Sequence, residues 1–287
     1  MSNILSGLEK FGLNAKDVSV FEEEKKEEET TQVQGKDAIK EPEETEFLLE
    51  KGVRCVACDQ VFKTKVIKSG RVRRLEPDED LRPRHQYIDT LKYGITACPH
   101  CGYAAMSANF DTLTSTQAKL IKEAISSRFQ GGMKAEPEIY TYEEALDRYK
   151  LALFNTIVKK GKASEKAFIC LKMSWLLRGK CETLPQSTTV EKVIYDECHK
   201  EELEFYQEAY DGFLMASSTE NYPMCGMEQS TVDFLIAYMA FKLGKLDVAS
   251  RFVSGILTSQ NTNRKMKDKA LDLKNEIIHV IKNRSNN

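Results

Sequence analysis

Two pairs of cysteines are the residues of this sequence whose types and spacing point most directly to chemistry. Cys55 and Cys58 form one Cys-x-x-Cys pair, and Cys98 and Cys101 form a second after residues 59–97. Each such turn places two sulfurs on one side of a tight loop, and two turns complete a tetrahedral sulfur site of the kind that zinc prefers. The pattern therefore predicts one structural zinc ion with these four cysteines as its ligands.

The segment between the pairs is longer than in most sites of this kind. Lengthening a flexible loop from about 18 to about 39 residues costs only roughly 0.7 kcal/mol, whereas a structural zinc contributes on the order of 10–16 kcal/mol to folding. Reduced cysteines without a role, or a redox-active pair, are the alternatives. Of the nearby histidines, we expect His100 to be a turn residue, and an additional-ligand role for His85 is the less favoured alternative.

Apolar and β-branched residues flank both cysteine pairs at the spacing of short strands. They include Val53, Val61, Phe62, Val66, Ile67, Val72, Tyr93, Ile95 and Thr96. Ser69-Gly70 is compatible with a hairpin turn, and Gly102 supplies the unrestricted backbone that the second cysteine turn needs. We interpret this region as a zinc ribbon.

Composition narrows the class of protein. The 287 residues are 41% hydrophobic, and 42 basic residues nearly balance 44 acidic ones, so the chain has no overall bias toward nucleic acid or acidic lipid. No apolar run is long enough to cross a bilayer, and the N-terminus lacks the pattern of a signal peptide. We therefore expect a cytoplasmic protein, whose reducing surroundings favour metal binding over disulfides.

Charge is unevenly distributed along the chain. Acidic residues greatly outnumber basic ones between Glu22 and Glu46, so we predict that residues 1–46 form a disordered acidic tail. Within that tail, residues 4–13 have apolar positions at roughly helical spacing. They fit either a frayed helix or a docking segment.

The chain after Ala135 has the periodicity of helices. Thr141-Tyr142-Glu143-Glu144 is a capping box, and the helix it opens should end near Lys159. A largely buried second helix should end near Gly179. Further helices are expected from about Thr189, and near residues 229–243, 246–259 and 264–282.

One helical pair resembles a tetratricopeptide unit. Its characteristic positions are Leu235, Tyr238, Leu243, Gly244, Ala249, Phe252 and Leu257. The repeat period is not kept elsewhere, so an ordinary helical bundle remains an alternative. The predicted fold class is α+β, with a small β-rich zinc ribbon in residues 47–134 followed by an all-α tetratricopeptide-like domain in residues 135–287.

These residues also carry a family resemblance. The run from Cys55-Val56-Ala57-Cys58 to Cys98-Pro99-His100-Cys101-Gly102-Tyr103-Ala104, with Arg73, Asp78, Asp80, Pro83 and Tyr93 between, resembles the bacterial family of domain of unknown function 2225. The resemblance extends from about Phe47 to Ile281. The first turn departs from the family pattern, with Val56 in place of Pro and Asp59 in place of Gly. The resemblance implies a zinc-ribbon-like part and a tetratricopeptide-like part, and no established activity.

The segment between the cysteine pairs is rich in charge. Its basic residues are Lys63, Lys65, Lys68, Arg71, Arg73, Arg74, Arg82 and Arg84, and its acidic ones include Glu76, Asp78, Glu79 and Asp80. A basic ribbon loop could contact phosphates of nucleic acid. Pairing of Arg73 or Arg74 with Asp78 and Asp80 would instead make an internal ion-pair network or a protein-facing loop. A divalent-cation site at the two aspartates is a weaker alternative.

No catalytic motif is present, since the chain lacks a glycine-rich phosphate loop, a Gly-x-Ser-x-Gly elbow and a His-Glu-x-x-His sequence. Cys170, Cys181, Cys198 and Cys225 are isolated in sequence, and a Cys198-His199 metal or redox site is a minor alternative. The preferred function is a non-enzymatic scaffold or adaptor that presents a helical groove to a protein or peptide, with an anchor among Tyr206, Tyr210 and Tyr238. The alternative is a zinc-ribbon protein that binds nucleic acid.

Overall fold

The computed structural model describes residues 41–131 and 136–285. The chain divides into two units, residues 1–41 and 42–287, and every described helix and strand lies in the second unit. The predictions for residues 1–40, including the apolar pattern at residues 4–13, lie outside the described residues. The second unit begins at Pro42, so it includes residues 42–46, which composition had assigned to the acidic tail.

Those first residues are held by the body of the unit. Glu44–Phe47 forms the 3₁₀ helix η2. The Glu44 carboxylate accepts hydrogen bonds from Lys92 Nζ at 2.7 Å and from the Tyr93 hydroxyl at 2.6 Å. These contacts explain why acidic residues at this point of the chain are ordered.

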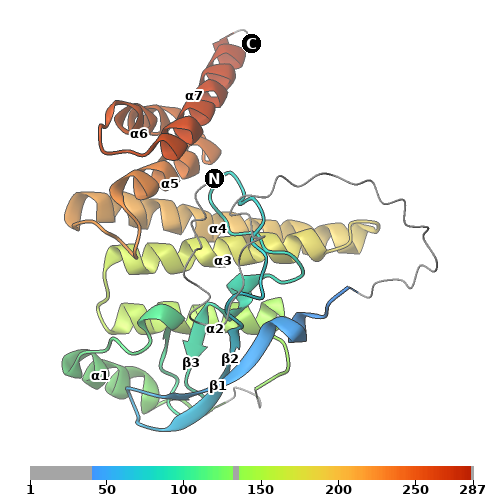
Figure 1. The fold of residues 1–287 in the computed structure, drawn as a ribbon, viewed down its shortest axis with the longest axis vertical. Coiled ribbons are helices and arrows are strands. Elements are labelled where there is room, and N and C mark those ends of the chain that lie inside the picture. The colour runs from blue at the N-terminus through green and yellow to red at the C-terminus, as the bar shows by residue number, and fades with distance from the viewer. Residues whose placement is uncertain (1–40, 132–135, 286–287) are drawn as a thin grey trace, which may run out of the picture. The chain divides into compact units, whose positions relative to one another are not determined.

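The fold is α+β with a helical majority, as predicted (Figure 1). Two antiparallel hairpins come first, β1 (Leu48–Arg54) with β2 (Val61–Ile67), and β3 (Ile95–Ala97) with β4 (Ala104–Met106). The helices that follow are α1 (Ser115–Ile121), α2 (Tyr142–Val158), α3 (Ala163–Thr183), α4 (Thr189–Thr219), α5 (Gln229–Lys242), α6 (Leu246–Thr258) and α7 (Arg264–Ser285). Short helical turns are η3 (Thr90–Tyr93), η4 (Ser107–Asn109) and the π-helix η5 (Lys122–Ser126).

Each cysteine pair lies in the loop of its own hairpin. The register pairs Arg54 with Val61, so Cys55 and Cys58 lie between β1 and β2, and it pairs Ala97 with Ala104 around the second cysteine pair. The Ser69-Gly70 turn follows β2 and does not close a hairpin, which differs from the expectation for that segment. The strands meet instead at the cysteine loops.

The predicted starts of two helices are confirmed: α2 begins after the predicted Thr141 capping box, and α4 begins at Thr189. Thr141 caps α2 in a capping box with Glu144, and Thr188 caps α4 in one with Glu191. The expectation that the second helix ends near Gly179 is wrong, because α3 continues to Thr183. Gly179 lies inside α3, at a point where the side chains of Arg82 and Asp89 approach the helix closely.

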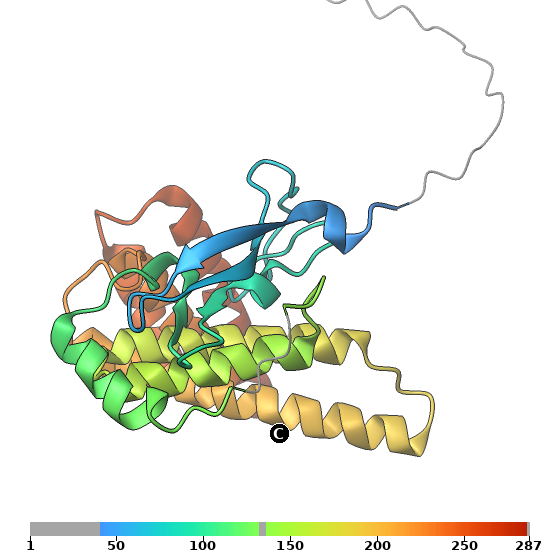
Figure 2. The same ribbon diagram turned by 90° about the horizontal axis from the view of Figure 1, so that it is seen from below.

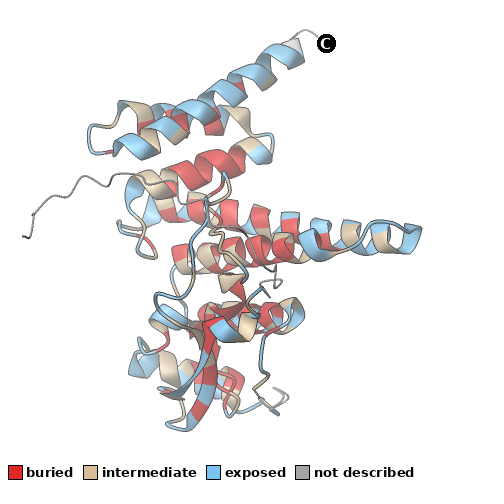
Figure 3. Ribbon diagram, turned by 45° about the vertical axis from the view of Figure 1, so that its right-hand side comes forward, coloured by how far each residue is buried: buried red, intermediate tan, exposed pale blue. Residues whose placement is uncertain are grey.

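Successive helices pack against their neighbours in the order α2, α3, α4, α5, α6 and α7 (Figure 1). Nearest-neighbour packing of this kind is typical of repeat-like helical stacks. The α5–α6 pair turns at Leu243-Gly244, where Gly244 has a φ of 74°, at the position expected for the tetratricopeptide-like unit. The buried residues concentrate where α3, α4 and α5 meet, whereas α7 and the N-terminal end of α4 are largely exposed (Figure 3).

The cysteine-bearing hairpins join this stack through α2, which packs on both β3 and β4. Figure 2 shows the β1–β2 hairpin on the same side of the helices as the loops that connect it to η3. Alternate residues of the β3–β4 hairpin belong to different cores: Ile95, Ala97 and Ala104 pack with the helices, and Ala105 packs with the cysteines. Among the described residues, no helix is both long and apolar enough to span a membrane.

Two helical glycines give a matched test of the packing around α3. A Cβ at Gly179 would lie 2.7 Å from the side chains of both Arg82 and Asp89, whereas a Cβ at Gly255 in α6 would meet nothing within 4 Å. We expect Gly255→Ala to raise the free energy of unfolding by about 0.5–1 kcal/mol through helix propensity. Gly179→Ala should lower it by roughly 1–3 kcal/mol through overpacking. Urea denaturation measures both, and equal stabilisation by the two changes would contradict the close packing at Gly179.

Candidate metal centre

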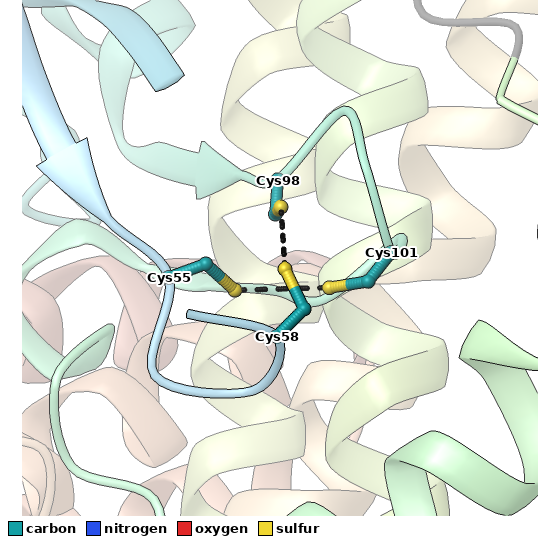
Figure 4. Close-up of side chains that lie close together, drawn as sticks. All are labelled: Cys55, Cys58, Cys98 and Cys101. Atoms are coloured by element: carbon teal, nitrogen blue, oxygen red, sulfur yellow. Dashed lines mark hydrogen bonds between the residues drawn. The ribbon is translucent and has the colours of Figure 1, made fainter. Parts of the chain in front are cut away.

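The four cysteines of the two pairs come together at the tips of the two hairpins. The Sγ atoms of Cys55, Cys58, Cys98 and Cys101 all lie within 4.8 Å of one another. The Cys55 and Cys101 sulfurs are 3.7 Å apart, as are those of Cys58 and Cys98 (Figure 4). Three of the four cysteines are buried, and Cys58 is partly exposed.

This arrangement fits a single ion. A tetrahedral metal with thiolate ligands at about 2.3 Å has sulfur–sulfur edges of about 3.8 Å, close to the two 3.7 Å separations. Four sulfur donors at such spacing suit a soft or borderline metal rather than Mg²⁺ or Ca²⁺, which take oxygen ligands. The cluster could therefore bind one metal ion through four cysteines.

The two cysteine turns have the same backbone hydrogen bonds. In the first turn, Asp59 N donates to Cys55 O at 2.8 Å, and Cys55 N donates to Gln60 O at 2.9 Å. In the second, Gly102 N donates to Cys98 O at 3.1 Å, and Cys98 N donates to Tyr103 O at 2.8 Å. The corresponding residues of the two turns thus form two equivalent knuckles that face each other.

Each knuckle requires a left-handed residue directly after its second cysteine. Asp59 has a φ of 63° and Gly102 a φ of 71°. Aspartate is among the few residues other than glycine that tolerate this conformation. Arg54 holds the Asp59 side chain with a 2.9 Å ion pair on the surface. The first turn therefore keeps the knuckle geometry, although it has aspartate where the family pattern has glycine.

The second knuckle is built into the core by its surroundings. Asn155 of α2 donates a hydrogen bond from Nδ2 to Gly102 O at 2.9 Å. The Phe129 ring lies over the same glycine, since a Cβ there would come within 2.6 Å of that ring. Tyr103 is fully buried, and its hydroxyl donates to Phe110 O at 3.0 Å. These contacts fix the backbone directly after Cys101.

Crowding of the sulfurs makes the cluster a poor place for several unpaired negative charges. Hydrogen bonds from Cys101 and Cys55 lower the pKa of the Cys98 thiol. Hydrogen bonding to Cys55 and Cys98, together with burial, raises the pKa of Cys101 far above its usual range. Thiolates this close together repel one another, so a cation among them would favour the deprotonation of all four cysteines.

The other candidates lie apart from this centre. Among the residues that the structure describes, the cluster contains neither His85 nor His100. His85 Nδ1 lies 3.0 Å from Thr90 Oγ1, and burial lowers the pKa of its imidazole. The pattern of the sequence did not reveal that Cys181 and Cys198 meet between α3 and α4 with their sulfurs 2.6 Å apart. Burial raises the pKa of both thiols.

Asp78 and Asp80, in the segment between the knuckles, form ion pairs, but their partners are not Arg73 and Arg74. Asp80 is 1% exposed, and its Oδ2 accepts a hydrogen bond from Trp175 Nε1 and pairs with Arg178, each at 2.9 Å. Asp78 pairs with Arg84 at 2.6 Å. The expected pairing was wrong because the true partner of Asp80 lies on α3, far along the sequence.

A second part of the same network joins the segment to the end of α3. Glu182 accepts from Arg82 Nη1 at 2.9 Å and from Arg84 Nη2 at 2.6 Å. Burial alone would raise the pKa of the Glu182 carboxyl, but hydrogen bonds from Arg84 and Arg82 outweigh burial and lower that pKa. Arg82 and Arg84, two of the basic residues considered for phosphate contact, are thus paired with a carboxylate of the protein itself. Arg71, Arg73 and Arg74 are exposed.

Comparison with known protein families finds one family whose model matches most of this α+β chain, including the four clustered cysteines. The model of a family described as uncharacterized proteins conserved in bacteria, domain of unknown function 2225, matches residues 48–277. The chain belongs to this family, as the resemblance of its cysteine turns indicated. It matches no curated protein and no solved structure at a significant level.

Substitutions at the two left-handed residues test the equivalence of the knuckles. Asp59→Gly should keep the free energy of unfolding within about 0.5 kcal/mol, because glycine adopts a positive φ freely and an exposed ion pair contributes little. Asp59→Val should lower it by roughly 1–3 kcal/mol, because a β-branched residue is strained there. Gly102→Ala should also destabilise the protein, since the added Cβ meets Phe129. Chemical denaturation of the three variants measures these free energies of unfolding. Equal stability of Asp59→Val and Asp59→Gly would contradict the assigned turn.

Proposed function

We propose that this protein is a non-enzymatic scaffold or adaptor in which a structural zinc ion joins two hairpins and a helical cleft binds a peptide segment of a partner. The observation that carries the metal part is the set of four Sγ atoms within 4.8 Å. Cys55, Cys58, Cys98 and Cys101 would hold the ion. When bound, zinc supplies a crosslink between the hairpins and has no open coordination position for a substrate.

The observation that supports peptide binding is a cleft of about 820 Å³ formed by α3, α4, α5 and the loop at residues 78–80. We call it the α3–α5 cleft. Tyr206 and Tyr238, two of the three tyrosines expected as groove anchors, line it, and Tyr210 does not. Leu203, an exposed apolar residue of α4, also lines it. An open cleft with aromatic walls and an apolar contact suits a peptide.

Nucleic-acid binding is the second candidate, and the exposure of Arg71, Arg73 and Arg74 is the observation that favours it. The overall balance of charge weighs against it. Binding through phosphates must weaken steeply with salt, with a log–log slope of roughly −0.7 to −0.9 for each phosphate contacted. Tight binding of a mixed-sequence RNA or DNA, lost when all three arginines become alanine, would favour this candidate over the scaffold.

Metal analysis tests the structural part of the proposal. We expect one zinc per chain in the purified protein and little or none in the double variant Cys58→Ser/Cys98→Ser, because the remaining two thiolates cannot complete the site. Cys225→Ser is the matched control, since Cys225 is a partly exposed cysteine outside the cluster, and it should keep the full metal content. Full metal retention in the double variant would overturn the ligand assignment.

A second experiment tests the cleft with pools of random-sequence dodecapeptides on a solid support. We expect some pools to bind the full chain, and Leu203→Ala to weaken that binding about three- to tenfold, because an apolar interface anchor typically contributes about 1 kcal/mol or more. Met215→Ala is the matched control, since Met215 is an exposed apolar residue of α4 outside the cleft. Equal effects of the two changes, or no binding by any pool, would contradict peptide binding in the cleft.

A further inference from the structure

The walls of the α3–α5 cleft carry an unusual surplus of negative charge. Its lining includes five carboxylates but only two permanently charged basic groups, Arg178 and Lys242. The carboxylates are those of Asp78, Glu79, Asp80, Glu182 and Glu202. A cleft lined by one sign of charge concentrates ligands of the opposite sign.

Three of these carboxylates are already satisfied within the molecule. Asp80 binds Trp175 and Arg178, and Glu182 binds two arginines of the loop. Glu202 pairs with Arg178 at 2.8 Å through Oε1 and with His199 at 3.0 Å through Oε2. These three carboxylates are therefore structural parts of the cleft wall and are not available to pair with a ligand.

Asp78 is also paired within the molecule, so the capacity that remains lies at Glu79. Asp78 pairs with Arg84 at 2.6 Å, and its buried Oδ2 lies 3.6 and 3.7 Å from the guanidinium nitrogens of Arg82 and Arg178. Glu79 is exposed at the edge of the cleft, where it accepts a hydrogen bond from the Tyr238 hydroxyl. A cationic group that enters the cleft would therefore meet the exposed Glu79 carboxylate, for which the described residues provide no ion-pair partner.

A second observation, independent of the acidic residues, is that the buried Tyr206 hydroxyl lacks a hydrogen-bond partner among the described residues. This side chain lines the cleft and is only 2% exposed, and its hydroxyl has no hydrogen-bond partner in the part of the chain that the structure describes. Buried hydroxyls in proteins nearly always have a partner. A ligand with polar hydrogens or acceptors would supply the partner that the protein itself does not.

The aromatic rings of the cleft already accept cations from the chain. The Arg178 guanidinium lies 5.9 Å from the centre of the Tyr206 ring, and Lys242 Nζ lies 5.5 Å from the centre of the Tyr238 ring. At the other end of the lining, Tyr195 and His199 stack with their ring centres 6.1 Å apart. Aromatic faces beside carboxylates are a combination that recognises arginine and lysine side chains.

We propose that the α3–α5 cleft binds a basic side chain, arginine or lysine, of a peptide partner, next to Glu79 and the Tyr206 hydroxyl. This inference rests on the proposed peptide-binding function and names the chemistry that the cleft selects. The occupant is an extended peptide segment with at least one positive charge, because the cleft is open to solvent and its uncompensated charge is negative.

The test uses the full chain and dodecapeptide pools of random sequence in which one central position is fixed as a single amino acid. We expect the arginine-fixed or the lysine-fixed pool to bind at least tenfold more tightly than the glutamate-fixed and glutamine-fixed pools. The two basic arms distinguish a site that requires a guanidinium from one that requires only an ammonium. Glu79→Lys, which reverses the charge at the exposed edge, should lower the binding of the preferred basic pool about tenfold.

Tyr206→Phe provides a readout that a purely structural role would not give. The change removes only a hydroxyl that has no partner among the described residues, so the urea midpoint of unfolding should not fall. Binding of the basic pool should weaken about three- to tenfold. Tyr210→Phe is the matched control, since Tyr210 is a buried tyrosine one turn further along α4 that does not line the cleft, and it should bind the pool like the parent protein.

The outcomes separate this inference from the function on which it rests. Peptide binding that is sensitive to Leu203→Ala but shows no preference for arginine or lysine would overturn the basic-side-chain proposal and leave the peptide-binding function standing. A basic preference that Tyr206→Phe and Glu79→Lys leave unchanged would place the selecting site elsewhere and also overturn the proposal. Failure of every pool to bind would remove both.

Discussion

The convergence of four cysteine sulfurs is the constraint on which the arrangement of the two hairpins depends. Each knuckle by itself is a short loop at the end of a two-stranded sheet, and an isolated hairpin is marginally stable in water. Three of the four cysteines are buried, and sulfurs this close together would repel one another as thiolates without a cation between them. An ion bound by four thiolates would remove that penalty and would tie the hairpins together.

The metal centre and the helical stack are mechanically joined through the second knuckle. Asn155 of α2 holds the backbone of Gly102, while the β3–β4 hairpin places Ile95 and Ala97 in the helical core. From the other direction, Asp80 anchors the long segment between the knuckles to Trp175 on α3. A buried carboxylate with a charged partner is costly to leave unpaired, so this anchor positions the segment closely. The same anchor places residues 78 and 79 at the wall of the α3–α5 cleft.

Much of this architecture could be predicted from local signals in the sequence. The Cys-x-x-Cys pairs predicted the cluster, and the Thr141 box with Glu144 three residues later marked where α2 begins. These signals are local because a tight turn or a capped helix end is specified by neighbouring residues. The Leu243-Gly244 turn between α5 and α6 followed from the same kind of pattern.

What could not be predicted depends on residues that are distant in sequence. Gly179 looked like a helix end, but its lack of a side chain serves the approach of Arg82 and Asp89 from the segment between the knuckles. Asp80 looked available to Arg73, but its partner is Arg178. The meeting of Cys181 with Cys198 likewise depends on how α3 and α4 pack. Spacing along the chain carries no information about such contacts until the helices are placed.

X-ray absorption at the metal edge of the purified full-length protein tests most directly the claim that one ion joins the two knuckles. We expect a zinc edge with a first shell of four sulfur neighbours at about 2.3 Å and no nitrogen or oxygen ligand. A first shell containing nitrogen or oxygen would contradict this claim, because the ion would then lie outside the cluster of Cys55, Cys58, Cys98 and Cys101.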